Sequence, residues 1–318
     1  MLLRSAFTAL AMVCSVGAHA AEFPDKIVRL IVPFAAGGNT DNLTRIFAEG
    51  LSVKWGQTVI VENKPGGGAT IGAAHVARSA PDGYTLLLGS VGMATNQYLF
   101  KKMPYQPADL TPLAMVAQGP NVLFIHPGLP YKNVTDLIQH AKSHPGAVTF
   151  ASSGVGTSPH LAAELFANRA GIEIIHVPYR GANPAANDLM GGQVNAFFSV
   201  LNLMPHVEQG RLRALAVTSE ERIPEVPELP TVDEAGKTEG VVSGTWFGFF
   251  APANVPDDVK QKIVGGLREV ASQKETKEKI AALALSPVYA DTAEFKKFIA
   301  AEEKRWSEVI QQQKISVD

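Results

Sequence analysis

Two short turns rich in glycine and hydroxyl side chains hold the residues best suited to binding a small anion. The first turn spans residues 34–41 and reads FAAGGNTD. The second spans residues 152–157 and reads SSGVGT. Glycine lets backbone N–H groups come close to a carboxylate, and a helix that begins at such a turn adds a partial positive charge. Residues 33–39 contain no Lys, Arg or His, so an anion bound there would be held mainly by the backbone.

Each turn is predicted to join a buried strand to a helix. Residues 28–32 are a short apolar run, and a helix is predicted to begin at Asp41 and to continue through Leu51. Residues 148–166 repeat this order of strand, turn and helix. Glycines also make ordinary tight turns between strands and helices, so one such turn would indicate little. Two of them, with flanking Ser, Thr and Asn donors, favour two lobes that face one small ligand.

Three side chains near these turns carry charge or can titrate. Asp41 is interpreted as a helix N-cap rather than as a general base. His160 follows Pro159 in the first turn of the second helix, where it either faces the cleft or hydrogen-bonds the turn as a structural histidine. Arg180, in the segment PYRGANP, is the one cation near a predicted strand end. It either reaches the ligand or lies exposed on a loop.

The motifs of nucleotide-binding proteins and common hydrolases are missing from the sequence. There is no G-x-x-x-x-G-K-[ST], and the second turn has Pro159 where the dinucleotide fingerprint needs its third glycine. There is also no G-x-S-x-G and no H-E-x-x-H. We therefore expect no metal, no cofactor and no enzymatic activity.

The first residues are typical of a secretory signal peptide. Arg4 supplies a positive start, residues 6–16 are uncharged and largely apolar, and Ala18-His19-Ala20 fits the small-x-small rule for cleavage. Cleavage after Ala20 would remove Cys14, the only cysteine, and leave a chain without disulfides. We expect the protein to be exported to the periplasm.

Length and charge narrow the class of protein. With 318 residues, 46% of them hydrophobic, the chain is long enough for two domains. Its formal net charge of −2 argues against a nucleic acid or an anionic membrane as partner. After the signal peptide, no apolar run approaches the ~18 residues of a membrane helix. We expect a monomer without membrane insertion.

The remaining sequence predicts an α/β protein of two lobes. Its alternating apolar runs and helices favour parallel sheets with right-handed crossovers. We expect the chain to cross between lobes near Val122 and again near Thr245. This gives a signal peptide at residues 1–20, a discontinuous first lobe of residues 22–124 and 245–318, and a second lobe of residues 125–244. Further strands are predicted at residues 58–62, 84–89, 173–177, 194–199, 212–217 and 245–251, helices at 70–78, 134–142, 184–190, 257–272, 274–282 and 291–312, and an outer loop at 223–239.

Six sequence blocks, taken in order, resemble the Bug family, the extracytoplasmic receptors of tripartite tricarboxylate transporters. The blocks are PFAAGGNTD, VENKPGGGATIGAAHVARSAPDGYTLLLGS, SSGVGTSPHLAAELF, VPYRGANPA, GGQVNAFFS and GRLRALAVTS. The resemblance implies a type II periplasmic-binding-protein fold, in which two α/β lobes joined by crossing strands close on a ligand. It also implies that a carboxylate is held by the loops after the first strand of each lobe, partly through ordered waters. The matching positions are residues 35–41 and 152–157.

Two departures from the family pattern bear on the ligand. The first loop has Ala35 where many relatives have proline. Ser199 stands where many relatives have an acid, which disfavours an amine-bearing ligand such as an amino acid.

The sequence therefore predicts a periplasmic solute-binding protein, not an enzyme, that captures a small organic carboxylate by lobe closure and delivers it to a tripartite tricarboxylate transporter. The carboxylate is expected to be a dicarboxylate, a tricarboxylate or an aromatic acid. Two alternatives remain: a ligand-sensing partner of a sensor kinase, and an exported enzyme with His160 and Asp41 as acid and base. The expected ligand-binding residues are Phe34, Ala35, Ala36, Gly37, Gly38, Asn39, Thr40, Asp41, Ser152, Ser153, Gly154, Gly156 and Thr157, with Ser90, His160, Arg180 and Asn202 at the ligand's far end.

Overall fold

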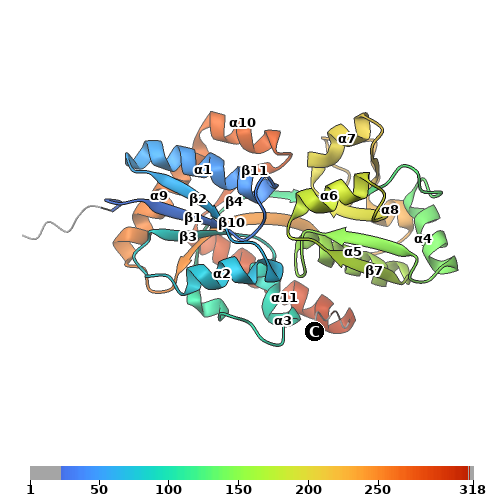
Figure 1. Ribbon diagram of the computed structural model, residues 1–318, viewed down its shortest axis with the longest axis horizontal. Coiled ribbons are helices and arrows are strands. Elements are labelled where there is room, and N and C mark those ends of the chain that lie inside the picture. The colour runs from blue at the N-terminus through green and yellow to red at the C-terminus, as the bar shows by residue number, and fades with distance from the viewer. Residues whose placement is uncertain (1–22, 314, 316–318) are drawn as a thin grey trace, which may run out of the picture.

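The computed structural model describes residues 23–313 and 315 and contains two β-sheets covered by helices (Figure 1). The predicted signal peptide lies outside the described residues. The first sheet has the strand order β11-β4-β10-β3-β1-β2, and the second has the order β7-β6-β8-β5-β9. The strands are β1 (Val28–Val32), β2 (Val59–Asn63), β3 (Thr85–Gly89), β4 (Leu110–Pro120), β5 (Val122–Ile125), β6 (Val148–Ser152), β7 (Ile174–Pro178), β8 (Ala196–Ser199), β9 (Arg213–Val217), β10 (Gly244–Pro252) and β11 (Ser286–Ala290).

Helices cover both faces of each sheet because successive residues of a buried strand point to opposite faces. In β1, Leu30 packs in one apolar cluster with Phe47, whereas Ile31 packs in another with Phe295. The helices are α1 (Asn39–Trp55), α2 (Thr70–Ala77), α3 (Gly92–Leu99), α4 (Val134–Ser143), α5 (Ser158–Ala170), α6 (Ala182–Met190), α7 (Met204–Glu208), α8 (Val232–Gly236), α9 (Asp257–Ser272), α10 (Lys274–Ala282) and α11 (Thr292–Gln313), with short 3₁₀ helices η1 (Gly67–Ala69), η2 (Pro107–Asp109) and η3 (Leu201–Leu203).

Only part of each sheet is parallel. Strands β1, β2 and β3 pair in parallel, as do β6, β7 and β8, and this confirms the predicted strand–helix–strand units. Strands β4 and β10 run antiparallel to each other, and β5 runs antiparallel to both of its neighbours. The chain leaves the first sheet through β4, enters the second through β5, and returns to the first through β10.

The chain passes between the sheets at Asn121 and again at Ser243. Asn121 separates β4 of the first sheet from β5 of the second, and Ser243 immediately precedes β10. Both residues bond to Thr218: its hydroxyl accepts from the backbone N–H of Asn121 at 3.0 Å, and its carbonyl accepts from the backbone N–H of Ser243 at 2.9 Å. The two crossings are therefore tied together.

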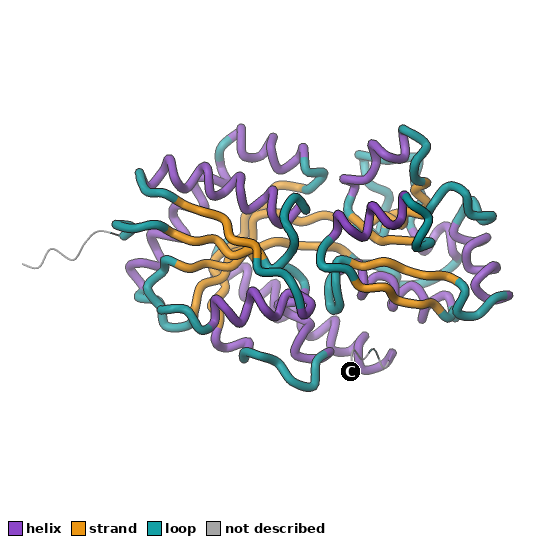
Figure 2. Tube along the Cα trace, viewed as in Figure 1, coloured by secondary structure: helices purple, strands orange, loops and turns teal. Residues whose placement is uncertain are grey.

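We propose that the two sheets with their helices form two lobes. The first lobe holds α1–α3 and α9–α11, and the second holds α4–α8 (Figure 1). The boundary expected at residue 124 falls inside β5, a strand of the second sheet, so we place the first boundary at Asn121 instead. In Figure 2 the loops that follow the strands gather where the two sheets face each other.

Several elements differ from the sequence prediction. Helix α1 begins at Asn39, two residues before the expected start, and α8 lies within the region expected to be a loop. Helix α3 and strand β11 were not predicted. Both are short, and neither has a clear apolar repeat in its sequence.

Candidate functional site

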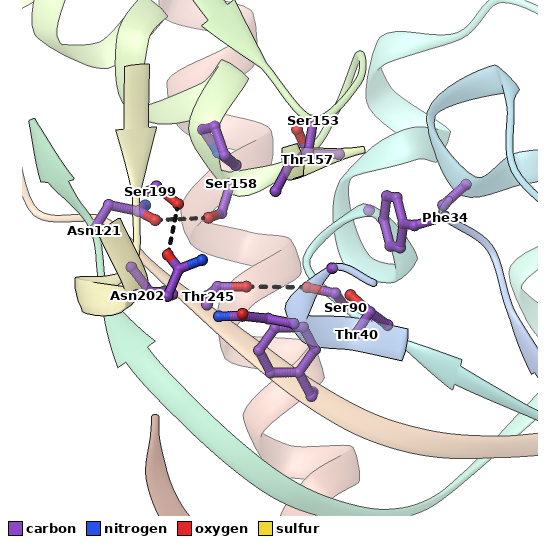
Figure 3. A pocket seen from close by; sticks show the side chains of 18 of the residues that line it. Phe34, Thr40, Ser90, Asn121, Ser153, Thr157, Ser158, Ser199, Asn202 and Thr245 are labelled. Carbon is purple, nitrogen blue, oxygen red and sulfur yellow. Dashed lines mark hydrogen bonds between the residues drawn. The ribbon is translucent and has the colours of Figure 1, made fainter. Parts of the chain in front are cut away.

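A cavity lies between the lobes, at the carboxyl ends of strands β1, β3, β6 and β8 (Figure 3). Ligands of open α/β sheets bind at such strand ends. The cavity encloses about 80 Å³, room for several water molecules or a small organic anion. It is lined by Phe34, Ala35, Gly38, Asn39, Thr40, Gly68, Ala69, Ser90, Gly92, Met93, Asn121, Ser153, Thr157, Ser158, Pro159, Ala182, Phe197, Ser199, Val200, Asn202, Thr245 and Phe247.

Some residues of the first glycine turn line the cavity, and others stabilise the conformation of the turn. Of the expected residues, those that line the cavity are Phe34, Ala35, Gly38, Asn39 and Thr40. Ala36, Gly37 and Asp41 do not line it. Gly37 has a φ of +82°, a backbone conformation that favours glycine.

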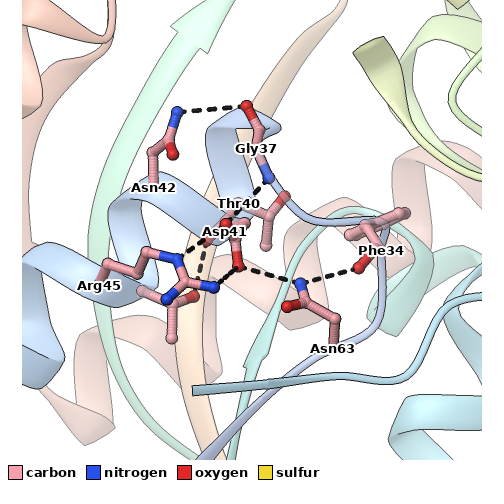
Figure 4. Close-up of polar contacts among 8 residues, drawn as sticks. Phe34, Gly37, Thr40, Asp41, Asn42, Arg45 and Asn63 are labelled. Atoms are coloured by element: carbon pink, nitrogen blue, oxygen red, sulfur yellow. Dashed lines mark hydrogen bonds and ion pairs between the residues drawn. The ribbon is translucent and has the colours of Figure 1, made fainter. Parts of the chain in front are cut away.

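Asp41 is a structural residue of the first lobe (Figure 4). Its carboxylate accepts hydrogen bonds from the backbone N–H of Gly37 at 2.9 Å, from Nδ2 of Asn63 at 2.9 Å and from Nε of Arg45 at 2.9 Å. Burial alone would raise the pKa of this carboxyl, but the bonds from Arg45, Gly37 and Asn63 more than offset it and hold the pKa below its usual value. The N-cap interpretation was wrong: Gly38 occupies that position, and Asp41 reaches back from the first helical turn.

The second turn is built in the same way. Ser153 and Thr157 line the cavity, whereas Ser152, Gly154 and Gly156 do not. The Ser152 hydroxyl is fully buried and accepts from the backbone N–H of Gly154 at 3.1 Å. The Thr157 hydroxyl donates to the carbonyl of Gly154 at 2.6 Å. These bonds fix the path of the turn.

Of the glycine N–H groups expected to bind an anion, all but that of Gly38 are already engaged. Those of Gly37 and Gly154 donate to Asp41 and Ser152, and that of Gly156 donates to Nδ1 of His160 at 3.1 Å. The glycines therefore shape the turns, and the donors nearest the cavity belong to the first residues of α1 and α5. The sequence could not show this, because it does not reveal which acceptor each N–H meets.

His160 supports the second turn from behind. It is 3% exposed, and its ring stacks on that of His176 with centroids 4.0 Å apart. Nε2 of His176 lies 2.6 Å from the Ser152 hydroxyl. Burial, with a smaller contribution from the neighbouring histidine, lowers the pKa of His160 to about 3, and burial lowers that of His176 to about 4. Of the two interpretations of His160, the structure has the histidine that hydrogen-bonds the turn.

The histidine pair predicts acid sensitivity. Between about pH 6.5 and about pH 4, the unfolded chain binds protons on both rings while the folded chain leaves them neutral, so the contribution of the pair to the free energy of unfolding should fall as pH falls. The melting temperature of His176→Gln, which can still bond Ser152, should decline less over this range. Exposed His144→Gln is the matched control. Equal slopes of melting temperature against pH in His176→Gln and the wild type would contradict the prediction.

The remaining expected residues divide between the cavity and the surface. Ser90 and Asn202 line the cavity, and the Ser90 hydroxyl lies 3.2 Å from that of Thr245. The Arg180 side chain is exposed and lies outside this cavity. Its backbone carbonyl instead accepts a hydrogen bond from the N–H of Ala35 at 3.1 Å, across the lobes.

A second contact joins the lobes near η1 and α3. The Thr95 hydroxyl donates to the carbonyl of Gly156 at 3.2 Å. Gly68 packs so tightly on Val155 that an added Cβ would lie 2.2 Å from the Val155 carbonyl oxygen. With the Ala35–Arg180 bond, these contacts hold the two lobes against each other around the cavity.

Sequence reasoning missed much of the wall contributed by the crossings and strand ends. The lining residues that it did not select are Gly68, Ala69, Gly92, Met93, Asn121, Ser158, Pro159, Ala182, Phe197, Ser199, Val200, Thr245 and Phe247. Asn121 carried a weak signal as a polar residue in an apolar run predicted to cross between lobes. The apolar lining residues carried no such signal in the sequence, because the wall of a cavity and the hydrophobic core are made of the same residue types.

None of the side chains lining the cavity is charged. Within the described residues, no cluster of three or more His, Cys, Asp or Glu side chains could hold a metal ion. Because the lining is uncharged, an anion in the cavity would meet neutral donors alone.

No helix of residues 23–313 is both long and apolar enough to span a membrane.

Comparisons with known proteins agree with this arrangement. Residues 43–315 match a family model described as the tripartite tricarboxylate transporter family receptor. BugT of Bordetella pertussis is 37% identical over 91% of this chain and 90% of its own length. Among solved structures, the periplasmic binding protein BugD is 32% identical, with a TM-score of 0.87 over 93% of this chain and 100% of BugD.

Two similar structures hold carboxylates. Rpa4515 of R. palustris, solved with adipate, is 33% identical and has a TM-score of 0.88 over 93% of this chain and all of Rpa4515. MatC of Rhodopseudomonas palustris, with bound malate, is 29% identical and has a TM-score of 0.84 over 91% of this chain and all of MatC. The two-sheet α/β fold is thus that of a periplasmic binding protein, as the sequence predicted.

Proposed function

The chain belongs to the tripartite tricarboxylate transporter receptor family, and from this premise we propose that it captures a small organic carboxylate between its lobes and presents it to a membrane transporter. We propose further that it works in the periplasm after removal of residues 1–20. The carboxylates in Rpa4515 and MatC support the ligand class.

The observation that carries this proposal is the meeting of two helix N-termini at a cavity without charged side chains. Helix α1 presents Gly38, Asn39 and Thr40, and helix α5 presents the backbone N–H of Ser158. The backbone N–H and the hydroxyl of Thr157 line the same end but both donate to the Gly154 carbonyl. The first N–H groups of a helix have no partner within it, and the helix dipole favours negative charge there. The ligand carboxylate is proposed to lie between these two ends.

Neutral donors are sufficient for useful affinity. A hydrogen bond to a charged group contributes about 1.5–3 kcal/mol. The helix dipole adds about 0.3–1 kcal/mol at each end. Four or five such interactions can therefore supply the roughly 8 kcal/mol of a micromolar complex, even after the ligand loses its water.

Lobe closure is proposed to couple binding to delivery. The donors of α1 and α5 belong to different lobes, so a ligand reaches both sets only when the lobes are together. Such a ligand shifts the population toward the closed form. The transporter would then recognise the closed pair of lobes.

The geometry does not favour the alternative of an exported enzyme. The Asp41 carboxylate accepts hydrogen bonds from three residues of the first lobe, and His160 is buried behind the second turn. Neither side chain lines the cavity. An acid and a base must reach the reacting atoms, and these two do not.

A thermal-shift screen tests the proposed function. A panel of monocarboxylates, dicarboxylates, tricarboxylates and aromatic acids should contain at least one that raises the melting temperature by several degrees, because a ligand that binds only the folded state stabilises it. Affinity for that acid should change less than about twofold between low and physiological ionic strength, since no exposed Lys or Arg clamps it.

Three results would count against this proposal. No stabilisation by any acid would reject carboxylate binding, and a steep loss of affinity with salt would reject neutral donors. Chemical turnover of a bound acid would support the enzyme instead. Uptake of the identified acid should also fall in cells that lack the protein, whereas unchanged uptake would favour a partnership with a sensor kinase.

A further inference from the structure

The end of the cavity nearest the crossings is lined by hydroxyl and amide side chains. We call this the hinge-side end, and its members are Ser90, Asn121, Ser199, Asn202 and Thr245 (Figure 3). They come from the ends of β3 and β8, from the first crossing, from η3 and from β10. Segments far apart in sequence thus place polar groups around one small space.

Two of these polar side chains, Asn121 and Ser199, already form hydrogen bonds with other side chains of the protein. Asn121 is 1% exposed; its Nδ2 donates to the Ser243 hydroxyl at 3.1 Å, and its Oδ1 accepts from the Ser158 hydroxyl at 3.2 Å. The Ser199 hydroxyl donates to Oδ1 of Asn202 at 3.2 Å. This last bond orients the Asn202 amide.

With its oxygen held by Ser199, Asn202 presents Nδ2 to the cavity (Figure 3). No described residue accepts a hydrogen bond from this nitrogen. The hydroxyls of Ser90 and Thr245 lie 3.2 Å apart, so one of them donates to the other, and the accepting hydroxyl keeps its own hydrogen to donate elsewhere. The hinge-side end therefore offers more donors than the protein itself can use.

We propose that Asn202 determines ligand specificity by requiring an oxygen acceptor at the ligand's far end. This inference rests on the proposed function, because it assumes that one carboxylate lies between α1 and α5. The preferred ligand is a short acid with a second carboxylate, keto or hydroxyl oxygen that receives the Asn202 N–H. An acid with an apolar tail would cover these donors without replacing their bonds to water, which is unfavourable.

The same lining disfavours an ammonium group. The cavity has no carboxylate among its lining residues, so a buried ammonium would have no counter-charge. Amino acids are therefore expected to bind less well than acids of equal length in which hydrogen or hydroxyl replaces the amine.

Matched ligands test the assignment by isothermal titration. Succinate and butyrate differ in the far carboxylate, as do adipate and hexanoate at greater length. The wild type should prefer the diacid at the better-fitting length by at least about tenfold, because a site built to hydrogen-bond an oxygen rejects the analogue that lacks it. In Asn202→Leu, which keeps the branching at Cγ but has no hydrogen-bonding group, the preference should fall below about threefold.

Further variants separate the role of the amide from a folding defect. Asn187→Leu makes the same replacement at an exposed helix position and should keep the wild-type preference. Asn202→Asp should bind the diacid more weakly than Asn202→Leu, because two carboxylates would then repel each other. Melting temperatures of the ligand-free variants report whether each has folded.

The outcomes distinguish this inference from the function on which it rests. If wild-type protein binds butyrate or hexanoate as tightly as its diacid partner, or if Asn202→Leu keeps the full preference, the role of Asn202 is overturned and carboxylate binding stands. If no acid binds, the proposed function fails and this inference fails with it.

Discussion

Replacement of Gly38 by valine is expected to reduce ligand affinity by at least about a hundredfold. Gly38 caps α1 with φ −79° and ψ 170°, an extended conformation that valine adopts readily. The nearest protein atom to an added Cβ is the Ala35 carbonyl oxygen, 3.9 Å away, so the protein itself has room. The residue lines the cavity, and the new side chain would occupy the space proposed for the ligand carboxylate.

The measurement is a titration of the ligand-free protein with the best acid from the thermal-shift screen. The melting temperature of ligand-free Gly38→Val should stay within a few degrees of the wild type. Gly265→Val is the matched control, because Gly265 lies in α9 with no atom within 4 Å of an added Cβ. Wild-type affinity in Gly38→Val would remove the first turn from the binding site.

Replacement of Gly68 by alanine should impair lobe closure. An added Cβ would lie 2.2 Å from the carbonyl oxygen of Val155 in the opposite lobe, and a backbone atom cannot turn aside as a side chain can. Opening the lobes relieves this contact, so the ligand-free protein should fold. Affinity is expected to fall by about tenfold or more, because closure becomes less favourable.

Small-angle scattering checks this expectation directly. Wild-type protein with saturating ligand should be more compact than Gly68→Ala at the same ligand concentration. Alanine at the φ of +59° found at Gly68 is also strained, by about 1–2 kcal/mol. Gly171→Ala controls for this strain, since Gly171 has φ +61° and nothing within 4 Å of an added Cβ. Equal compaction of wild type and Gly68→Ala would show that the contact does not govern closure.

The elements were predictable where the sequence has a strong local signal. Strand β1 has the predicted bounds of residues 28–32, and helices α9 and α10 have the predicted bounds of residues 257–272 and 274–282. A buried apolar run and a strong helical repeat each determine their structure locally. Strand β11 was not predictable in this way, because it exists through pairing with β4, a strand distant in sequence.

The candidate site was predictable in position but not in detail. The two glycine turns do meet at one cavity, as the repeated order of strand, turn and helix indicated. The N–H groups of Gly37, Gly154 and Gly156, however, bond to Asp41, Ser152 and His160, and of the glycines in these turns only Gly38 lies at the cavity. Each of these acceptors lies within four residues of its glycine, so the sequence shows it as a possible partner. Only the geometry of the loop decides which possible partner accepts the hydrogen bond.

The sequence by itself determined the α/β class, the family and the neutral character of the first turn, since these follow from residue types and local order. Only the tertiary structure decided which polar groups reach the cavity. Arg180 is exposed outside the cavity and His160 lies behind its turn, whereas Asn121 and Thr245 come from separate crossings to the same wall. The physical reason is that a site between lobes consists of groups that the chain crossings and the packing bring together from distant parts of the sequence. The hydrogen bonds formed in that packing then determine which donors remain for a ligand.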